Sequence, residues 1–364
     1  MLTSRSIHQP RPGRHPSNVR PSILLYLPPG PVEYVGNHDH NALERLTAEL
    51  PCQIVELNYR LDATHPYPTP IHDVLTGYDW VLQNLLPKRA IARPGRADHI
   101  GRIVVYGELI GGGLAAMLAL TECRSGQPGI VAAALRNPVI DWVDLPLDTA
   151  VDRENRGYDS PQSLDTVHQL VRVREQLFTK PEHYFDSFAS PMLFLRSVGQ
   201  DIPSRVHQQP ALDDMTQLML HNREEYGDYT ATAKEAQMAA EADSVQSQPQ
   251  RKRAKLYPSP TLGLRLPAFH IHADKTSPLH PQAEEFARRL KQSHVRQASR
   301  ADFGRKVLTE EEVKLLSGVE KQEYEDRQAH AKSMVHFSDV SKPSRSRALH
   351  LDVDAVTWLR KELS

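Results

Sequence analysis

Short apolar runs alternate with segments of helical periodicity along residues 22–135, and this alternation predicts the fold class. The runs that predict buried strands are 22–27 (SILLYL), 53–59 (QIVELNY), 103–106 (IVVY) and 130–135. Apolar residues recur at helical spacing in 41–50, 73–86 and 110–123. Strands that alternate with helices favour a mostly parallel, twisted sheet with helices on both faces. We therefore predict an α/β domain over residues 21–364.

The pattern loosens after residue 144, where we expect insertions into this domain. Residues 144–229 are mixed in character and predict a helical, lid-like insertion, whereas 230–260 are rich in Ala, Glu, Gln and Ser and predict a flexible basic insertion. Residues 299–332 are highly charged and predict an exposed helical excursion. A further strand is expected at 266–273, and helices are expected at 281–292 and 353–363.

Charge and composition narrow the partners and the compartment. A formal net charge of -1 argues against a general attraction to nucleic acid or to an anionic membrane. No apolar run reaches the roughly 18–20 residues that a membrane span needs. The two cysteines are too few for a disulfide framework, which favours the cytoplasm. Residues 1–20 lack the apolar core of a signal peptide and predict a disordered tail.

One basic cluster has two possible interpretations, which imply different cell compartments. The sequence Arg251-Lys252-Arg253-Ala254-Lys255 has the composition of a nuclear address. It also suits a solvated linker, which is the commoner meaning of such a match.

The segment 104–112 (VVYGELIGG) carries the candidate chemistry. A strand, then Gly-x-x-x-Gly-Gly, then a helix of small residues is the frame of a nucleophile elbow, in which a serine stands on a sharp strand-to-helix turn. Glycines are needed there because the turn brings backbone segments too close for a Cβ atom.

Other segments give this elbow a family resemblance. Residues 59–68 (YRLDATHPYP) resemble the Y-R-L-A-P-E-H-P-F-P stretch of the hormone-sensitive-lipase and arylacetamide-deacetylase branch of the α/β-hydrolases, and Asp73 and Trp80 follow at that branch's spacing. Residues 137–141 (NPVID), 185–191 (FDSFASP) and 333–337 (SMVHF) resemble later motifs of the same branch, in the same chain order. The resemblance implies an α/β-hydrolase fold. It also implies that the family's first antiparallel strands are missing here.

By this resemblance the relic triad positions are Leu109, Asp274 and His336. Leucine cannot act as a nucleophile because it has neither a lone pair nor a proton to give up. Glu108 matches the acidic residue that precedes the serine. The acidic triad member stays open, since the family's D-P-L pattern falls on Ser277 and Asp274 lies three residues earlier.

The relic oxyanion positions are Gly30, Pro31 and Ile110. The family's H-G-G-G motif, whose N–H groups bind the developing oxyanion, aligns with residues 28–31 (PPGP). Gly30 and Ile110 keep their N–H groups, but proline has none. Loss of one oxyanion donor typically costs about 10²–10³ in rate.

These defects predict a non-catalytic, esterase/lipase-like protein that binds a small apolar ligand or a protein partner. The expected ligand pocket is formed by Gly30, Glu108, Leu109, Ile110 and His336, and no cofactor is expected. One alternative is a carboxylic-ester hydrolase in which His336 and Asp274 activate a water molecule. Another is an interaction protein that binds its partner through 230–260.

The sequence contains two other candidate sites. Cys52 and Cys123 are both expected far from the elbow, as structural residues. His270 and His272 have an H-x-H spacing that suits Zn²⁺, with Asp274 or His280 as a third ligand. Hydrogen-bonded histidines are the commoner meaning of this pattern, so no metal site is predicted.

Overall fold

A computed structural model describes residues 5–8, 22–32, 38–86, 102–145, 161–196, 257–275, 277–298, 318–340 and 353–363. Residues 1–196 and 256–364 form one compact unit. The second unit, residues 197–255, lies outside the described residues.

The described residues contain a seven-stranded sheet and the helices around it. The strands are β1 (Arg5–His8), β2 (Ser22–Leu27), β3 (Gln53–Leu57), β4 (Arg102–Glu108), β5 (Gly129–Arg136), β6 (Ala268–Asp274) and β7 (Val335–Val340). The α-helices are α1 (His38–Glu49), α2 (Thr69–Asn84), α3 (Leu109–Thr121), α5 (Pro161–Leu177), α6 (Met192–Leu195), α9 (His280–Ala298), α11 (Gly318–Met334) and α12 (Val353–Leu363). Two short 3-10 helices are η1 (Pro181–Phe185) and η3 (Pro260–Leu262).

The strand order is β1-β3-β2-β4-β5-β6-β7, and every neighbouring pair is parallel except β1 with β3. The chain passes from β2 to β3 in one direction across the sheet and from β4 to β5 in the other. The order therefore reverses between β2 and β4. In open α/β sheets, ligands bind beyond the carboxyl ends of the strands at such a switch point.

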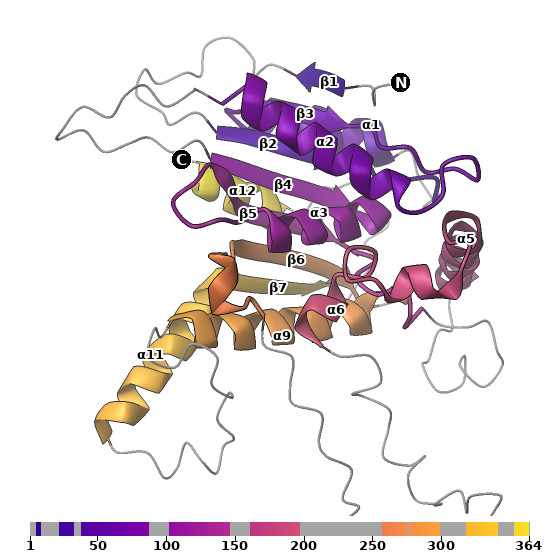
Figure 1. Ribbon diagram of the computed structural model, residues 1–364. Coiled ribbons are helices and arrows are strands. Elements are labelled where there is room, and N and C mark those ends of the chain that lie inside the picture. The colour runs from indigo at the N-terminus through magenta and orange to yellow at the C-terminus, as the bar shows by residue number, and fades with distance from the viewer. Residues whose placement is uncertain are drawn as a thin grey trace, which may run out of the picture. The chain divides into compact units, whose positions relative to one another are not determined.

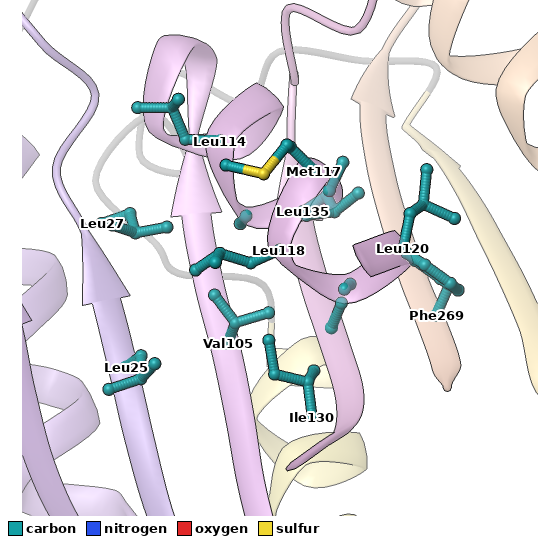
Figure 2. Close-up of a cluster of buried hydrophobic side chains, with 14 of the residues drawn as sticks. Leu25, Leu27, Val105, Leu114, Met117, Leu118, Leu120, Ile130, Leu135 and Phe269 are labelled. Atoms are coloured by element: carbon teal, nitrogen blue, oxygen red, sulfur yellow. The ribbon is translucent and has the colours of Figure 1, made fainter. Parts of the chain in front are cut away.

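Helices cover both faces of the sheet, as the alternation of strands and helices predicts (Figure 1). Helices α2, α3 and α9 pack on one face, which we call the α3 face, and α1 and α12 pack on the other, the α12 face. Figure 2 shows side chains of α3, including Met117, Leu118 and Leu120, among those of β2, β4, β5 and β6. α3 is buried along almost its whole length, so the helix after β4 is fixed by the core.

The predicted strands and helices of residues 22–135, together with those near 266–298 and 353–363, are confirmed to within a few residues. One expectation is wrong for four residues. Arg5–His8 lies in the region predicted as a disordered tail, but it forms β1 and pairs antiparallel with β3. Its sequence, RSIH, holds one apolar residue, so backbone pairing at the sheet edge, and not apolar patterning, defines this strand.

The predicted insertions are only partly described. Residues 161–196 of the lid-like insertion form α5, η1 and α6, and α11 forms the end of the charged excursion 299–332. Most of the basic insertion 230–260, including residues 251–255, lies outside the described residues. None of the helices that the structure describes combines the length and the apolar content needed to cross a membrane.

Candidate functional site

The elbow predicted at residues 104–112 is a strand-to-helix turn with Leu109 at its apex. β4 ends at Glu108, and Leu109 is the first residue of α3, with a φ of 46°. A left-handed conformation costs a non-glycine residue about 1–2 kcal/mol. Leu109 nevertheless holds it because β4 is paired on both sides, while its own carbonyl accepts a hydrogen bond from the Val139 N–H at 2.9 Å. The turn is therefore imposed by its surroundings.

Two glycines make this turn possible. A Cβ atom on Gly107 would overlap the carbonyl oxygen of Gly111. A Cβ atom on Gly111 would overlap the carbonyl oxygens of Leu27, the last residue of β2, and of Pro28. The glycines thus bring the first turn of α3 against the backbone that follows β2. This contact joins the elbow to the relic oxyanion segment.

Two pockets lie beside the elbow, at the switch point of the sheet. The first has a volume of about 270 Å³, is open, and is lined by residues that follow β2 and β3: Pro28, Gly30, Pro31, Asn58, Tyr59 and Leu61. The second has a volume of only about 20 Å³, and its walls are apolar and aromatic side chains, among them Leu61, Tyr67, Ile110, Trp142, Leu177 and Phe178. A volume of this size holds about one water molecule. The apolar pocket is therefore almost filled by its own side chains.

Leu61 and Ile110 separate the two pockets. Leu61 lines both of them. A Cβ atom on Gly30, in the wall of the open pocket, would lie 3.2 Å from Ile110 Cδ1 and 3.3 Å from Leu61 Cδ2. The side chains of Leu61 and Ile110, which we call the partition, thus lie against Gly30, and as hydrocarbons they make no hydrogen bond.

The α5 end of the lid-like insertion closes the apolar pocket. The Tyr67 hydroxyl donates a hydrogen bond of 2.6 Å to Asp186 Oδ2, and the Tyr67 N–H donates one of 2.7 Å to the Leu177 carbonyl. The ring of Phe178 contacts those of Tyr67 and Trp142, with centroids 5.5 Å apart in each pair. Contacts between residue 67 and residues 177–186 therefore form one wall of the apolar pocket.

Of the five residues predicted to form the ligand pocket, Gly30 and Ile110 do line pockets. Leu109 is 5% exposed and packs in the apolar cluster that includes Ile110 and Trp142. Glu108 points to the opposite, α12 face. There its Oε1 accepts a hydrogen bond of 2.6 Å from the Tyr106 hydroxyl and lies 3.3 Å from Arg136. Glu108 is therefore a buried, paired carboxylate behind the elbow.

The structure does not bring His336 to the elbow. His336 is the second residue of β7 and is exposed on the α12 face, where its ring stacks on that of His270 with centroids 6.4 Å apart. β7 is three strands away from β4, which corresponds to about 14 Å at the usual strand spacing. The SMVHF motif was predicted to place this histidine beside the elbow. Instead, β7 begins at Val335 and includes the histidine.

Asp274, the relic acidic residue, ends β6 at the carboxyl edge of the sheet. The side chain of Asn137 forms two hydrogen bonds with Asp274. The amide Nδ2 donates to Asp274 Oδ2 at 2.9 Å, and Oδ1 accepts from the Asp274 N–H at 3.0 Å. Burial raises the pKa of Asp274, but hydrogen bonds from His272 and Asn137 outweigh it and lower the pKa to about 2. Ser277, the other candidate, is buried and donates its N–H to the Asp274 carbonyl.

We expect Asp274 to stabilise the fold above pH 4 and to lose this effect as the pH falls towards 2. The reason is that its pKa falls from 3.8 to about 2 on folding, so the unfolded state binds the proton more tightly. Asp274→Asn should lower the free energy of unfolding by about 1–2 kcal/mol at pH 6, with allowance for partial solvent screening. Urea unfolding at pH 6, 4 and 2.5 checks this. A difference between variant and wild type that stays constant down to pH 2.5 would contradict it.

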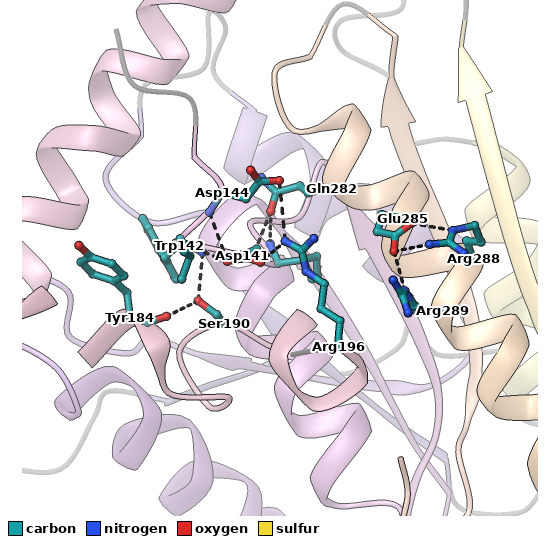
Figure 3. Close-up of polar contacts among 12 residues, drawn as sticks. Asp141, Trp142, Asp144, Tyr184, Ser190, Arg196, Gln282, Glu285, Arg288 and Arg289 are labelled. Atoms are coloured by element: carbon teal, nitrogen blue, oxygen red, sulfur yellow. Dashed lines mark hydrogen bonds and ion pairs between the residues drawn. The ribbon is translucent and has the colours of Figure 1, made fainter. Parts of the chain in front are cut away.

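Residues of the motifs that resemble the family form polar contacts with other segments of the chain. Asp73 accepts hydrogen bonds from Arg60 Nε at 2.9 Å and from Arg60 Nη2 at 2.7 Å, which ties α2 to the segment after β3. Figure 3 shows a second group around Asp141, whose Oδ2 accepts a hydrogen bond from Arg196 Nη2 at 2.7 Å. Gln282 Oε1 accepts the Ile140 and Asp141 N–H groups. The sequence pattern alone did not identify Arg196 and Gln282 as partners, since both are distant in the chain.

The rival nucleophiles and metal ligands are not assembled in the described part of the chain. Cys52 and Cys123 are buried and free, and burial raises the pKa of each thiol to about 12. Among the described residues, no group of three or more His, Cys, Asp or Glu side chains could hold a metal ion. Of the H-x-H pair, His270 packs its ring on Trp358, and His272 contacts Ser338 and Asp274.

Comparison with known proteins agrees with this architecture. Residues 32–196 match the profile of a family described as alpha/beta hydrolase fold. Esterase LipI of Mycobacterium tuberculosis is 36% identical over 89 residues, 24% of this chain and 25% of that protein. Tuliposide A-converting enzyme b1 of Tulipa gesneriana is 32% identical over 129 residues, 34% of this chain and 33% of that enzyme. The matched segments thus span a quarter to a third of these relatives.

Solved esterases show a similar chain course. An esterase of Pyrobaculum calidifontis shares 18% identity at a TM-score of 0.44, covering 80% of this chain and 72% of that one. A thermostable esterase of Pseudomonas putida shares 13% at a TM-score of 0.49, covering 100% and 79%. The profile match and the strand order identify an α/β-hydrolase fold.

Proposed function

We propose that this α/β-hydrolase-fold protein is a non-catalytic relative of esterases and lipases whose elbow site binds a small apolar ligand. The observation that carries the proposal is Leu109. It stands directly after β4 with a φ of 46°, the place and the strained conformation of a nucleophile, but it is a hydrocarbon packed among apolar side chains.

Three further features support binding instead of hydrolysis at the elbow. Pro31, in the wall of the open pocket, has no N–H to offer an oxyanion, so only the Gly30 and Ile110 groups remain of the relic set. His336 is about three strand spacings away, too far to take a proton from residue 109. The side chains that pack around Leu109 are apolar.

The shape of the site favours an apolar ligand that enters from the open pocket. The open pocket has room for one, whereas the apolar pocket is occupied by its own side chains. The Leu61 and Ile110 side chains of the partition make no hydrogen bonds. A ligand that moves them therefore breaks only van der Waals contacts. A protein partner at 230–260, a cytoplasmic location and a nuclear address at 251–255 stay predictions.

A first test opens the partition. Leu61→Ala should join the two pockets and tighten binding of the neutral fluorescent probe N-phenyl-1-naphthylamine at least about threefold, because more apolar surface leaves water on binding. A fluorescence titration measures this. The matched control is Leu262→Ala, since Leu262 is an exposed leucine in η3, and it should leave the affinity unchanged. Equal affinities for wild type and Leu61→Ala would sink the proposed site.

A second test places a hydroxyl group at the elbow. Leu109→Ser should not react with a fluorophosphonate at residue 109, because neither the imidazole nor the full donor set is there. Peptide mapping by mass spectrometry reads out residue 109 separately from every other serine. Labelling of Ser at position 109 at the rate of an active esterase would show that the elbow is still a catalytic site.

A further inference from the structure

Asn58, which lines the open pocket, carries an amide that the proposed elbow function leaves unused. It directly follows β3 at the carboxyl edge of the sheet and is half-buried. Within the ranges that the structure describes, no hydrogen bond joins its carboxamide to another residue. Side-chain amides with reduced access to water usually have a partner. A ligand in the open pocket can supply that partner.

The chain segment that carries Asn58 is fixed by its neighbours. The Tyr59 hydroxyl donates a hydrogen bond of 2.5 Å to the Pro28 carbonyl, which joins the segments after β3 and β2. The Arg60 N–H donates to Asp73 Oδ2 at 3.0 Å, in addition to the two bonds from the guanidinium. Because this wall is already ordered, a ligand that binds Asn58 loses little affinity to the ordering of the protein.

The wall of the open pocket favours a neutral ligand. The six residues that line it include no acid and no base. Arg60, the charged residue closest to Asn58 in the sequence after it, is neutralised by Asp73, with 2.7 Å between Arg60 Nη2 and Asp73 Oδ1. A charged ligand would lose hydration in this pocket without gaining an opposite charge.

An asparagine amide presents a donor and an acceptor side by side. A primary carboxamide matches both, because its N–H donates to Oδ1 while its oxygen accepts from Nδ2. An ester or a ketone offers acceptors alone, and so does a carboxylate, which also brings a charge. A secondary amide in its usual trans form directs its N–H and its oxygen to opposite sides. The primary carboxamide is therefore the head group that fits.

We infer that the open pocket binds a small neutral molecule whose primary carboxamide pairs with Asn58 and whose apolar body lies towards Leu61. The inference rests on the proposed elbow function and adds the head group that the elbow site recognises. Leu61 lines both pockets, so a body placed against it reaches the partition. The volume of about 270 Å³ is just below the roughly 300–1,000 Å³ of pockets for drug-sized ligands, which suits a molecule of one ring.

The test compares four ligands of one ring by ligand-observed NMR titration of the full-length protein: benzamide, N-methylbenzamide, benzoate and toluene. Benzamide should bind the wild type at least about tenfold more tightly than N-methylbenzamide or benzoate, because each of these leaves part of the Asn58 amide unpaired. This comparison needs no variant.

Asn58→Leu keeps the size of the side chain and removes both hydrogen bonds. It should weaken benzamide at least about tenfold and should not weaken toluene. The matched control is Asn84→Leu, since Asn84 is an exposed asparagine at the end of α2 that donates to the Trp80 carbonyl. It should leave both affinities unchanged.

Absence of saturable benzamide binding, equal affinities of the wild type for benzamide and N-methylbenzamide, or benzamide binding that survives in folded Asn58→Leu would each overturn the inference. None of these results would decide the elbow proposal, which is tested by Leu61→Ala with the naphthylamine probe. Benzamide selectivity that depends on Asn58, with no effect of Leu61→Ala on that probe, would support the carboxamide head while refuting the proposed joining of the two pockets.

Discussion

Replacing Gly111 by alanine should lower the free energy of unfolding by at least about 3 kcal/mol, because the new methyl group has nowhere to go. Its Cβ atom would overlap the carbonyl oxygens of Leu27 and Pro28 and lie 2.9 Å from the Leu27 carbonyl carbon. All of these are backbone atoms at the end of β2, so α3 would have to separate from the sheet. A domain has only about 5–15 kcal/mol of total stability, and the loss is therefore a large part of it.

Urea unfolding followed by circular dichroism measures this loss, and soluble yield gives a first indication. Gly318→Ala is the matched control, since a Cβ atom there meets nothing within 4 Å and the residue begins a helix. It should change the free energy of unfolding by no more than about 0.5 kcal/mol. If Gly111→Ala proved as stable as Gly318→Ala, the close approach of α3 to β2 would be wrong.

The main part of the sheet was predictable because its strands are buried on both faces. Runs such as SILLYL and IVVY are almost continuously apolar, whereas α1 and α2 have apolar residues at helical spacing, so the two periods are easy to tell apart. The two edge strands gave no such signal. β1 contains a single apolar residue, Ile7, and β7 (VHFSDV) directs apolar residues to one face and His336 and Ser338 to the other.

The elbow was predictable and the contacts between β6 and β7 were not, for a related reason. The glycine spacing of residues 107–112 is local in sequence and follows from one tight turn, so the position of Leu109 could be read directly. The contact between His272 and Ser338 spans 66 residues and depends on the register of β6 with β7. A shift of one residue in that register would turn Ser338 to the other face. The motif around His336 therefore could not show that His272 is the histidine beside Asp274.

The buried ion pair between Asp141 and Arg196 should be the most sensitive polar contact of the fold. Asp141 is 1% exposed at its side chain, and its Oδ1 also accepts the Val143 N–H at 2.8 Å. Arg196→Met would leave that carboxylate buried without its cation, which typically costs about 3–5 kcal/mol. The segment of residues 140–144, which Gln282 and Ser190 hold against α9 and α6, would loosen with it.

Urea unfolding at pH 7 checks this against a surface pair of the same chemistry. Arg288→Met removes an arginine that is 52% exposed and pairs with Glu285 on α9, and the expected loss is at most about 1 kcal/mol. The double variant Asp141→Asn/Arg196→Met should be more stable than Arg196→Met alone. The asparagine amide oxygen still accepts the hydrogen bond from the Val143 N–H, and the neutral amide leaves no buried charge without a partner. Equal losses for Arg196→Met and Arg288→Met would mean that Asp141 reaches solvent in solution and that the 140–144 segment is not packed as described.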